Sequence, residues 1–248
     1  MQTKFAVQLY SLRNVINENF PSILEKVSKI GYDGVEFAGF HELQARELKN
    51  ILTGLNLQSE GSHTSFDDLS TKFDEVIEFN QILNTKYIII PHYQYVTEDD
   101  YKKMAEFCQK TGEKVNAAGM KLLYHNHGFE FEQTFNGKMG LDILKDNTTK
   151  EAFSFQLDLY WAKYQGLDPV QLMESMNNRC TTIHLKDMKN LQTKKMTEVG
   201  TGIVDVKSIL KAAKALDLKW VTIEQDDIYI DPFESIKISL DNVKKIKI

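Results

Sequence analysis

PSILEKVSKIGYDGVEF, residues 21–37, contains one complete helix-to-strand unit. Ile23, Val27 and Ile30 recur at helical spacing, so this segment is predicted to be a helix with one apolar face. Gly31 then suits the left-handed backbone position at which helices commonly end. A short apolar run follows almost at once, which is typical of a buried strand. The stretch therefore predicts a helix that turns directly into a strand of a parallel sheet.

Seven further runs resemble the strand that ends this stretch, and the strand openings recur about every 30 residues, the size of one strand-plus-helix unit. The eight predicted strands are FAVQLY (5–10), DGVEFA (33–38), LQSEGSH (57–63), YIIIPHY (87–93), KLLYHNH (121–127), FSFQLDL (153–159), TTIHLKD (181–187) and WVTIEQD (220–226). One-sided helical patterns lie between them; that at 141–145 is the weakest. Asp168, Asp205 and Asp231 are predicted to cap helices. No strand precedes a glycine-rich phosphate turn, so an open doubly wound sheet is disfavoured. The prediction is an α/β fold, a single (β/α)₈ TIM barrel over residues 1–248.

Composition limits the classes of function. The chain has 248 residues, a formal net charge of −5 and lysines spread along its length, which argues against a nucleic-acid partner. Two cysteines, Cys108 and Cys180, have no metal-type spacing and imply no disulfide framework. No signal peptide and no apolar run of about 18 residues is apparent, so we expect a cytoplasmic protein without a membrane partner. A homodimer is a possible assembly.

Polar residues interrupt the apolar strands near their carboxyl ends, where active sites of such barrels form. Alternation places His125 with His127, Asp158 with Gln156, His184 with Lys186, and Glu224 with Thr222, each pair on one face of its own strand. Buried ionisable groups need partners, and two imidazoles with two carboxylates suit Mn²⁺, Co²⁺ or Zn²⁺ better than Ca²⁺; Mg²⁺ is a further candidate. The predicted metal ligands are His125, Asp158, His184 and Glu224.

Each of these residues also has a purely structural interpretation. His184 could be a hydrogen-bonded core histidine, Asp158 could cap a turn, and Glu224 could belong to an acidic surface loop. For two further residues, Glu36 and Glu60, a surface position is at least as well supported as a role behind the metal ligands.

The chain resembles the xylose-isomerase-like TIM-barrel superfamily, also called the sugar phosphate isomerase/epimerase family. The resemblance rests on VQLYSLR, GYDGVEF, YHNHGFEF, LDLYWAKYQGLDPV, HLKDM, EVGTGIVD and the final IEQD…DPFESIKISL. It implies one divalent metal held by Glu, Asp, His and Glu at the ends of strands five to eight. Asp158, His184 and Glu224 match the last three positions. His125 replaces the first glutamate, as in the YHNH subgroup, which is similar to inosose dehydratase and the 3-keto-glycoside hydratases.

The resemblance and the residue pattern together predict an isomerase or epimerase acting on a keto-sugar or cyclitol through a metal-stabilised enediolate. A dehydratase or hydratase-type lyase using the same site is the first alternative, and a non-catalytic sugar-binding barrel is the second. A DNA endonuclease would need a basic surface that the acidic balance disfavours.

The remaining candidate residues have predicted roles around the metal. The acid/base candidates are Glu224, Glu130, His127 and Lys186. Lys186 could also anchor a substrate hydroxyl with Asp187 as its partner, or simply lie on a solvated loop. The predicted substrate contacts are His127, Trp161, His63 and His92. For Trp161, packing at the barrel rim is an equal alternative to stacking on a sugar ring.

Overall fold

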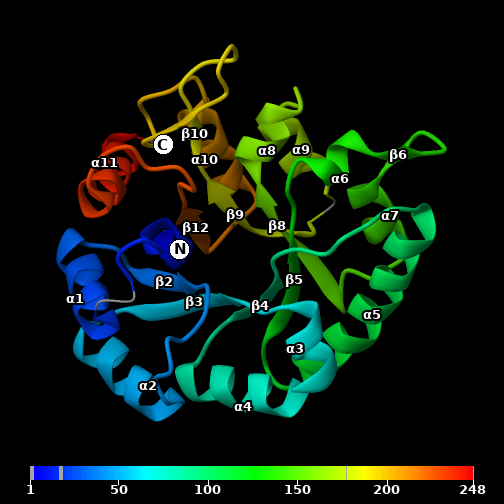
Figure 1. Ribbon diagram of the computed structural model, residues 1–248. Helices are drawn as coiled ribbons and strands as arrows, with labels where there is room; N and C mark the ends of the chain where they lie inside the picture. Colours follow the sequence, from blue (N-terminus) through cyan, green and yellow to red (C-terminus); the bar gives the residue numbers. More distant parts are fainter. Residues whose placement is uncertain (1–2, 17–18, 177, 248) are drawn as a thin grey trace.

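Eight parallel strands close into a barrel in the computed structural model, which describes residues 3–16, 19–176 and 178–247. Around the barrel the strand order is β1-β12-β9-β8-β5-β4-β3-β2 (Figure 1). The barrel strands are β1 (Lys4–Gln8), β2 (Gly34–Phe37), β3 (Gln58–His63), β4 (Tyr87–Ile90), β5 (Lys121–His125), β8 (Phe153–Asp158), β9 (Cys180–Leu185) and β12 (Trp220–Ile223). The predicted (β/α)₈ fold is confirmed, and every predicted run overlaps one barrel strand.

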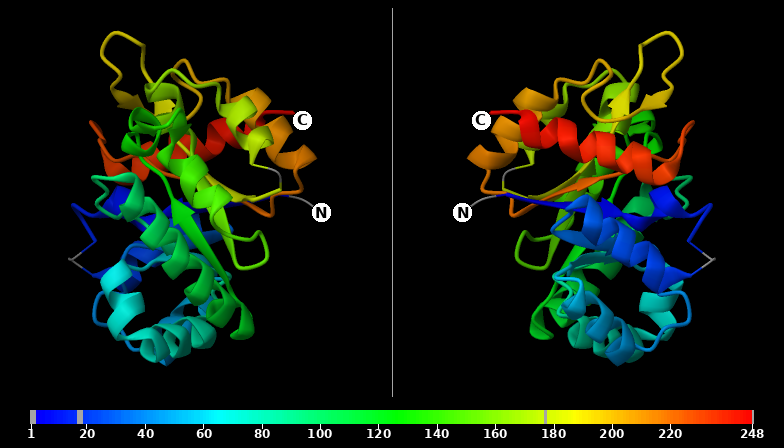
Figure 2. Two further views of the ribbon diagram at one scale, coloured as in Figure 1. Left: turned by 90° about the vertical axis from the view of Figure 1, so that its right-hand side faces the viewer. Right: turned by 90° about the vertical axis from the view of Figure 1, so that its left-hand side faces the viewer.

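The differences from the predicted strands lie at their ends. Leu9 and Tyr10 belong to a 3₁₀ turn, Leu9–Leu12, instead of the first strand. In four other predicted runs the observed strand ends before the last polar residues of the run. Two short hairpins were not predicted, because strands of two residues carry no periodic signal. They are formed by β6 (Thr134–Phe135) with β7 (Lys138–Met139), and by β10 (Asp187–Met188) with β11 (Met196–Thr197). The segment between β10 and β11 projects beyond the carboxyl end of β9 (Figure 2).

Helices surround the barrel (Figure 1). They are α1 (Phe20–Ile30), α2 (Ala45–Gly54), α3 (Phe66–Thr71), α4 (Phe73–Leu83), α5 (Glu98–Ala117), α6 (Phe129–Glu132), α7 (Gly140–Asp146), α8 (Leu159–Tyr164), α9 (Pro169–Ser175), α10 (Val206–Ala215) and α11 (Pro232–Lys245). The predicted caps form, because Asp168, Asp205 and Asp231 accept hydrogen bonds from backbone amides in the first turns of α9, α10 and α11. Gly31 ends α1 with φ at 102°, as its sequence position predicts. Among the described residues, no helix is both long enough and apolar enough to cross a membrane.

The apolar core lies between the barrel wall and the helices. Ile23, Leu24 and Val27 of α1 are buried there beside outward-facing strand residues such as Val35. Burying each such side chain stabilises the fold by about 1.5–3 kcal/mol. On the far side of the barrel, Gly112 of α5 lies so close to a neighbouring loop that an added Cβ would be 2.1 Å from the backbone oxygen of Ala152.

The barrel interior is polar instead of apolar. Its fully buried side chains include the amides and carboxylates of Gln8, Glu36, Glu60, Gln156 and Asp158. Burying so many polar groups costs free energy unless they bind one another or a ligand. The strand ends therefore hold a connected polar network in place of the usual layers of aliphatic side chains.

Candidate metal centre and cavity

The structure brings the four predicted ligands together at the carboxyl end of the barrel. His125 ends β5, Asp158 ends β8, His184 lies on β9 and Glu224 follows β12 directly. All four are buried, and one ligand atom from each lies within 4.8 Å of the others. Strand register explains the convergence, because Asp158 is paired with His184 and Thr222 is also paired with His184. Glu224 is 4% exposed, so it does not belong to a surface loop.

Asp158 has one oxygen committed to the fold and one available. Its Oδ1 accepts hydrogen bonds from the amides of Tyr160, at 3.0 Å, and Trp161, at 3.2 Å, and so begins α8. The alternative interpretation of Asp158 as a capping residue is thus correct. The strand β8 ends at Asp158 and does not continue through the apolar residues that follow. Its buried Oδ2 has no hydrogen-bond partner and lies 3.7 Å from His125 Nε2. A buried carboxylate oxygen that accepts no hydrogen bond, and that lies among other ligand atoms and 2.9 Å from the Lys186 ammonium, is a position that favours positive charge.

His125 presents one nitrogen to the same point. Its Nδ1 lies 3.0 Å from Oε1 of Gln156, an acceptor, so Nδ1 carries the proton and Nε2 keeps its lone pair. Burial, together with the neighbouring His184 and His63, holds the pKa of His125 well below its usual range. A neutral imidazole with a free nitrogen is the form that binds metal.

Two carboxylates hold His184 from opposite sides. Its Nε2 lies 2.6 Å from Glu36 Oε1, and its Nδ1 lies 2.6 Å from Glu224 Oε2. Burial alone would lower the pKa of His184, but these carboxylates raise it well above its usual value. A metal ion would take the place of the proton on Nδ1, while Nε2–H would still be donated to Glu36, which is a common arrangement behind metal-binding histidines.

Glu36 is the centre of the polar network, and a surface position for it is wrong. The side chain is fully buried, and its oxygens accept hydrogen bonds from Gln8 Nε2, at 2.6 Å, and Gln156 Nε2, at 2.5 Å. His63 Nε2 lies 3.0 Å from Glu36 Oε1 as well. Burial alone would raise the pKa of Glu36, but His184 and His63 hold it well below the usual range. This carboxylate therefore links the residues behind the metal ligands.

Glu60 is also fully buried, so a surface position is wrong for this residue too. Burial and the nearby Glu36 raise its pKa well above the usual value, which favours the neutral carboxyl. Neither oxygen has a hydrogen-bond partner among the described residues. Glu60 thus lies behind the site, as the interior alternative predicted.

Lys186 supplies a buried positive charge beside the ligands. Its Nζ lies 2.9 Å from Asp158 Oδ2, 2.7 Å from Glu224 Oε2 and 2.8 Å from Asp226 Oδ2. The contact with Asp158 is close enough for an ion pair but lacks hydrogen-bond geometry. Burial alone would lower the pKa of Lys186, but the three carboxylates raise it well above its usual value. The side chain is 2% exposed, so it does not lie on a solvated loop.

Asp187 is not the partner of Lys186. Its carboxylate instead accepts hydrogen bonds from the backbone amides of Met188, Gly200, Gly202 and Val204. Asp187 therefore fixes the loop that follows β11. The last two residues of the HLKD sequence thus have different roles, because Lys186 contacts the site carboxylates and Asp187 holds this loop.

A cavity of about 460 Å³ opens onto this cluster. Three of the predicted substrate contacts, His63, His92 and His127, line it, together with His125, Lys186 and Glu224. Burial and the nearby Lys186 lower the pKa of His127 to about 3, so its imidazole is neutral. Its Nδ1 is enclosed without a partner, and its Nε2 has no hydrogen bond to a described residue. His63, His125 and His184 form a second group of potential ligands with atoms within 4.8 Å.

Glu130 and Trp161, predicted as an acid/base group and a substrate contact, lie outside the described lining of the cavity. Glu130 is fully buried, and its oxygens accept hydrogen bonds from the Tyr124 hydroxyl, at 2.7 Å, and the His127 amide, at 2.8 Å. Burial raises the pKa of Glu130 to about 7. This position supports His127 instead of facing a substrate. Trp161 packs with its ring centroid 6.0 Å from that of His127, in agreement with the packing alternative.

Sequence reasoning assigned no site role to Tyr10, Gln156 and Asp226, and gave Glu36 only an undecided one. The alternation that found Asp158 also places Gln156 on the inward face, and Glu36 stands at the same inward position of GVEF. Asp226 stands two residues beyond Glu224, where the strand has already ended. Tyr10 is 46% exposed at the rim and carries no sequence signal.

Comparison with known proteins agrees with the barrel fold. The family model described as Xylose isomerase-like TIM barrel matches residues 24–246. An inosose dehydratase of Lacticaseibacillus casei is 21% identical over 260 residues, covering 87% of this chain and 85% of that protein. The structure of a sugar phosphate isomerase/epimerase from Parabacteroides distasonis is similar with a TM-score of 0.82, at 24% identity and covering 100% and 96% of the two chains. The IolI protein, solved with a bound zinc atom, has a TM-score of 0.77 at 16% identity, with 99% of each chain covered. The solved structures support the fold alone.

Proposed function

Because the chain belongs to the Xylose isomerase-like TIM barrel family, we propose that it is a divalent-metal-dependent dehydratase of a keto-sugar or cyclitol. The observation that carries this proposal is the convergence of His125, Asp158, His184 and Glu224 on one point beneath a cavity. Relatives named inosose dehydratase support the reaction class. A bound Mn²⁺, Co²⁺ or Zn²⁺ would supply a Lewis acid that polarises a substrate carbonyl.

The donor set fits such an ion. Asp158 Oδ2 is buried and unpartnered by any hydrogen bond, and His125 Nε2 keeps a lone pair. Two nitrogen and two carboxylate ligands favour Zn²⁺, Mn²⁺ or Co²⁺ over Ca²⁺. His184 Nδ1 and Glu224 would complete the set.

The acid/base groups favour elimination over two-base epimerisation. Epimerisation by two bases needs a free group on each side of the reacting carbon, but His125, across from Glu224, is held by Gln156 and turned toward Asp158. A dehydration can use one base. We assign that base to His127 Nε2. The negative charge that a substrate gains beside it as the proton next to the carbonyl leaves would raise the low pKa of this imidazole, so that it can accept that proton. As the carbon–carbon double bond forms and the β-carbon–oxygen bond breaks, the hydroxyl leaves with that proton as water.

Lys186 would stabilise the negative charge of the enediolate. Its carboxylate partners keep it protonated, so it acts as a fixed positive charge at the edge of the cavity and not as the base. Glu130 holds the backbone of His127, and Glu36 holds His184.

The test combines bound-metal measurement with product analysis. Metal-loaded protein would be incubated in D₂O with a panel of inososes and keto-sugars, and NMR would follow deuterium uptake and loss of water. We expect dehydration of at least one compound, and loss of turnover with retained metal in His127→Asn. The matched control is His41→Asn, because His41 packs against Phe20 away from the cavity.

Each other outcome contradicts a stated part of the proposal. Deuterium exchange without loss of water would refute dehydration and indicate an isomerase or epimerase. Binding without exchange would refute enzymatic proton transfer in favour of a sugar-binding barrel. Full metal content in both Asp158→Asn and Glu224→Gln would refute the ligand set, with Glu174→Gln on the exposed face of α9 as the control.

A further inference from the structure

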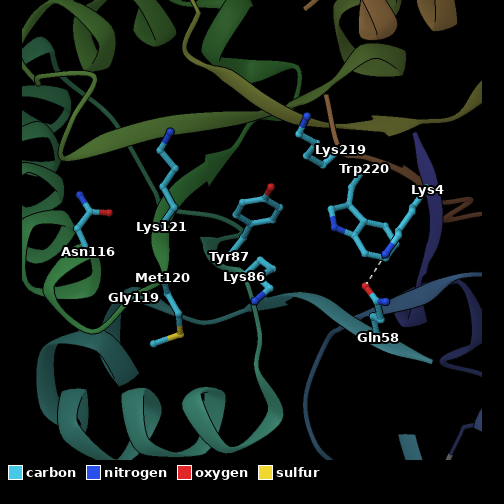
Figure 3. A pocket seen from close by; sticks show the side chains of 10 residues that line it. All are labelled: Lys4, Gln58, Lys86, Tyr87, Asn116, Gly119, Met120, Lys121, Lys219 and Trp220. Carbon is cyan, nitrogen blue, oxygen red and sulfur yellow. Dashed lines mark hydrogen bonds between the residues drawn. The ribbon is translucent and has the colours of Figure 1, made fainter. Parts of the chain in front are cut away.

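A second cavity lies at the opposite end of the barrel, where the strands begin. It has a volume of about 460 Å³, equal to that of the cavity at the carboxyl end. We call it the N-terminal cavity (Figure 3). Its lining residues are Lys4, Gln58, Lys86, Tyr87, Asn116, Gly119, Met120, Lys121, Lys219 and Trp220. It shares no lining residue with the cavity at the metal centre, so it is a separate site.

The charge of the N-terminal cavity is opposite to that of the whole chain. Lys4, Lys86, Lys121 and Lys219 line it, and no aspartate or glutamate is among its described lining residues. The chain as a whole carries a net charge of −5. Four like charges around one hollow repel one another and raise the local concentration of anions.

Two of the four lysines have partners and two do not. Lys219 Nζ forms an ion pair with Asp217 at 2.6 Å, and Lys4 Nζ donates a hydrogen bond to Gln58 at 3.0 Å. For Lys86 and Lys121, no hydrogen bond or ion pair of Nζ to any described residue exists. Their ammonium groups are therefore available to an anion.

Aromatic side chains lie between these lysines. Tyr87 lies between Lys121 and Trp220 in Figure 3, and Lys86 lies beside Tyr87. Trp220 is only 5% exposed, and Lys4 Nζ lies 5.4 Å from its ring centroid. The rings of Tyr87 and Trp220 thus line one hollow that four ammonium groups surround, which distinguishes these lysines from ones scattered over an open surface.

We propose that the N-terminal cavity binds a small phosphate-bearing polyanion, of which inorganic pyrophosphate is the simplest member. Lysine ammonium groups are compact, rotatable donors suited to phosphate oxygens. Lys86 and Lys121 would contact the phosphates directly, and Lys4 and Lys219 would add favourable charge. In Figure 3 the ammonium groups of Lys86 and Lys121 lie on opposite sides of Tyr87, so a ligand with two anionic groups would present one group to each lysine. This proposal does not depend on the reaction at the metal centre.

Trp220 provides a local reporter. The chain has two tryptophans, so Trp161→Phe leaves Trp220 as the only one. Metal-free Trp161→Phe protein would be titrated with sodium pyrophosphate at constant ionic strength, and tryptophan emission would be recorded. We expect a saturable change, and about a tenfold or greater loss of affinity in Lys86→Ala/Lys121→Ala. Calorimetry on the chain with both tryptophans supplies a second measurement.

The control variant is Lys102→Ala/Lys110→Ala, which removes the same charge from the exposed face of α5. Unchanged affinity in the control supports the site. Equal weakening in both double variants would overturn it, because binding would then follow net charge. An equal affinity for sulfate or orthophosphate would overturn the polyanion assignment. Absence of both heat and emission change would overturn the site itself. Circular dichroism on every variant separates these results from misfolding.

Discussion

In the metal-free protein, the positive charge of Lys186 balances three carboxylates. Replacing Lys186 with methionine removes that charge. The Nζ distances to Asp158, Glu224 and Asp226 lie between 2.7 and 2.9 Å. At an effective dielectric constant of about 20, each pair at such a distance attracts by about 6 kcal/mol before desolvation is counted. Removing one partner of a buried ion pair costs about 3–5 kcal/mol in net terms. We therefore expect Lys186→Met to lower the free energy of unfolding by about that amount.

The assay is urea unfolding followed by circular dichroism, with EDTA and then with saturating Zn²⁺ or Mn²⁺. In EDTA the variant should unfold at much lower urea than the unsubstituted protein. With metal, the difference should shrink, because the variant lacks the ammonium group that competes for the same carboxylates and should bind the ion more tightly. A tenfold lower Kd in the variant would reduce the difference by about 1.4 kcal/mol at saturating metal.

The control is Lys110→Met, which removes an exposed ion pair with Glu106 and should cost less than about 1 kcal/mol. The reasoning fails if Lys186→Met is as stable in EDTA as the control. It also fails if added metal leaves the difference unchanged.

The remaining predictions concern a metal-supporting residue, a pH effect and a packing contact. Glu36→Gln should weaken Zn²⁺ binding by about 10–100-fold in calorimetry, and an unchanged Kd would contradict its link to His184. Glu130 has a folded pKa of about 7 against 4.5 unfolded, so its neutral form stabilises the fold below pH 4.5, and that contribution is lost as pH rises toward 7. In urea titrations Glu130→Gln should lose less stability between pH 5 and 8 than the unsubstituted protein; parallel curves would refute this. Gly112→Ala should destabilise by about 1–3 kcal/mol, and thermal unfolding equal to that of Gly54→Ala, where an added Cβ meets nothing within 4 Å, would argue against the contact with Ala152.

Strand and helix order were predictable because each unit repeats one local pattern. Gly31 and the aspartate caps depend on a few neighbouring residues, so sequence spacing alone locates them. The four metal-ligand candidates followed from alternation, since register between parallel strands converts a shared face into a shared point. These parts of the fold and the site are encoded locally.

The second layer of the site was not predictable in the same way. Glu36 contacts His184 across 148 positions of the chain, and only the closure of the barrel brings β2 to face β9. Lys186 likewise finds Asp226 and Asp158 instead of the adjacent Asp187. Partners chosen by three-dimensional closure leave no spacing pattern in the sequence, so proximity along the chain gave the wrong partner for Lys186.

Asp158 divides its two oxygens between the start of α8 and the metal centre, and this division limits what a substitution at the position can report. Alanine would remove both functions together, so a loss of activity would be confounded by about 1 kcal/mol of lost helix capping. Asparagine keeps a capping oxygen while removing the charge, so it separates the two. A variant series at this position should therefore begin with asparagine, and alanine then adds the loss of the cap as a separate effect.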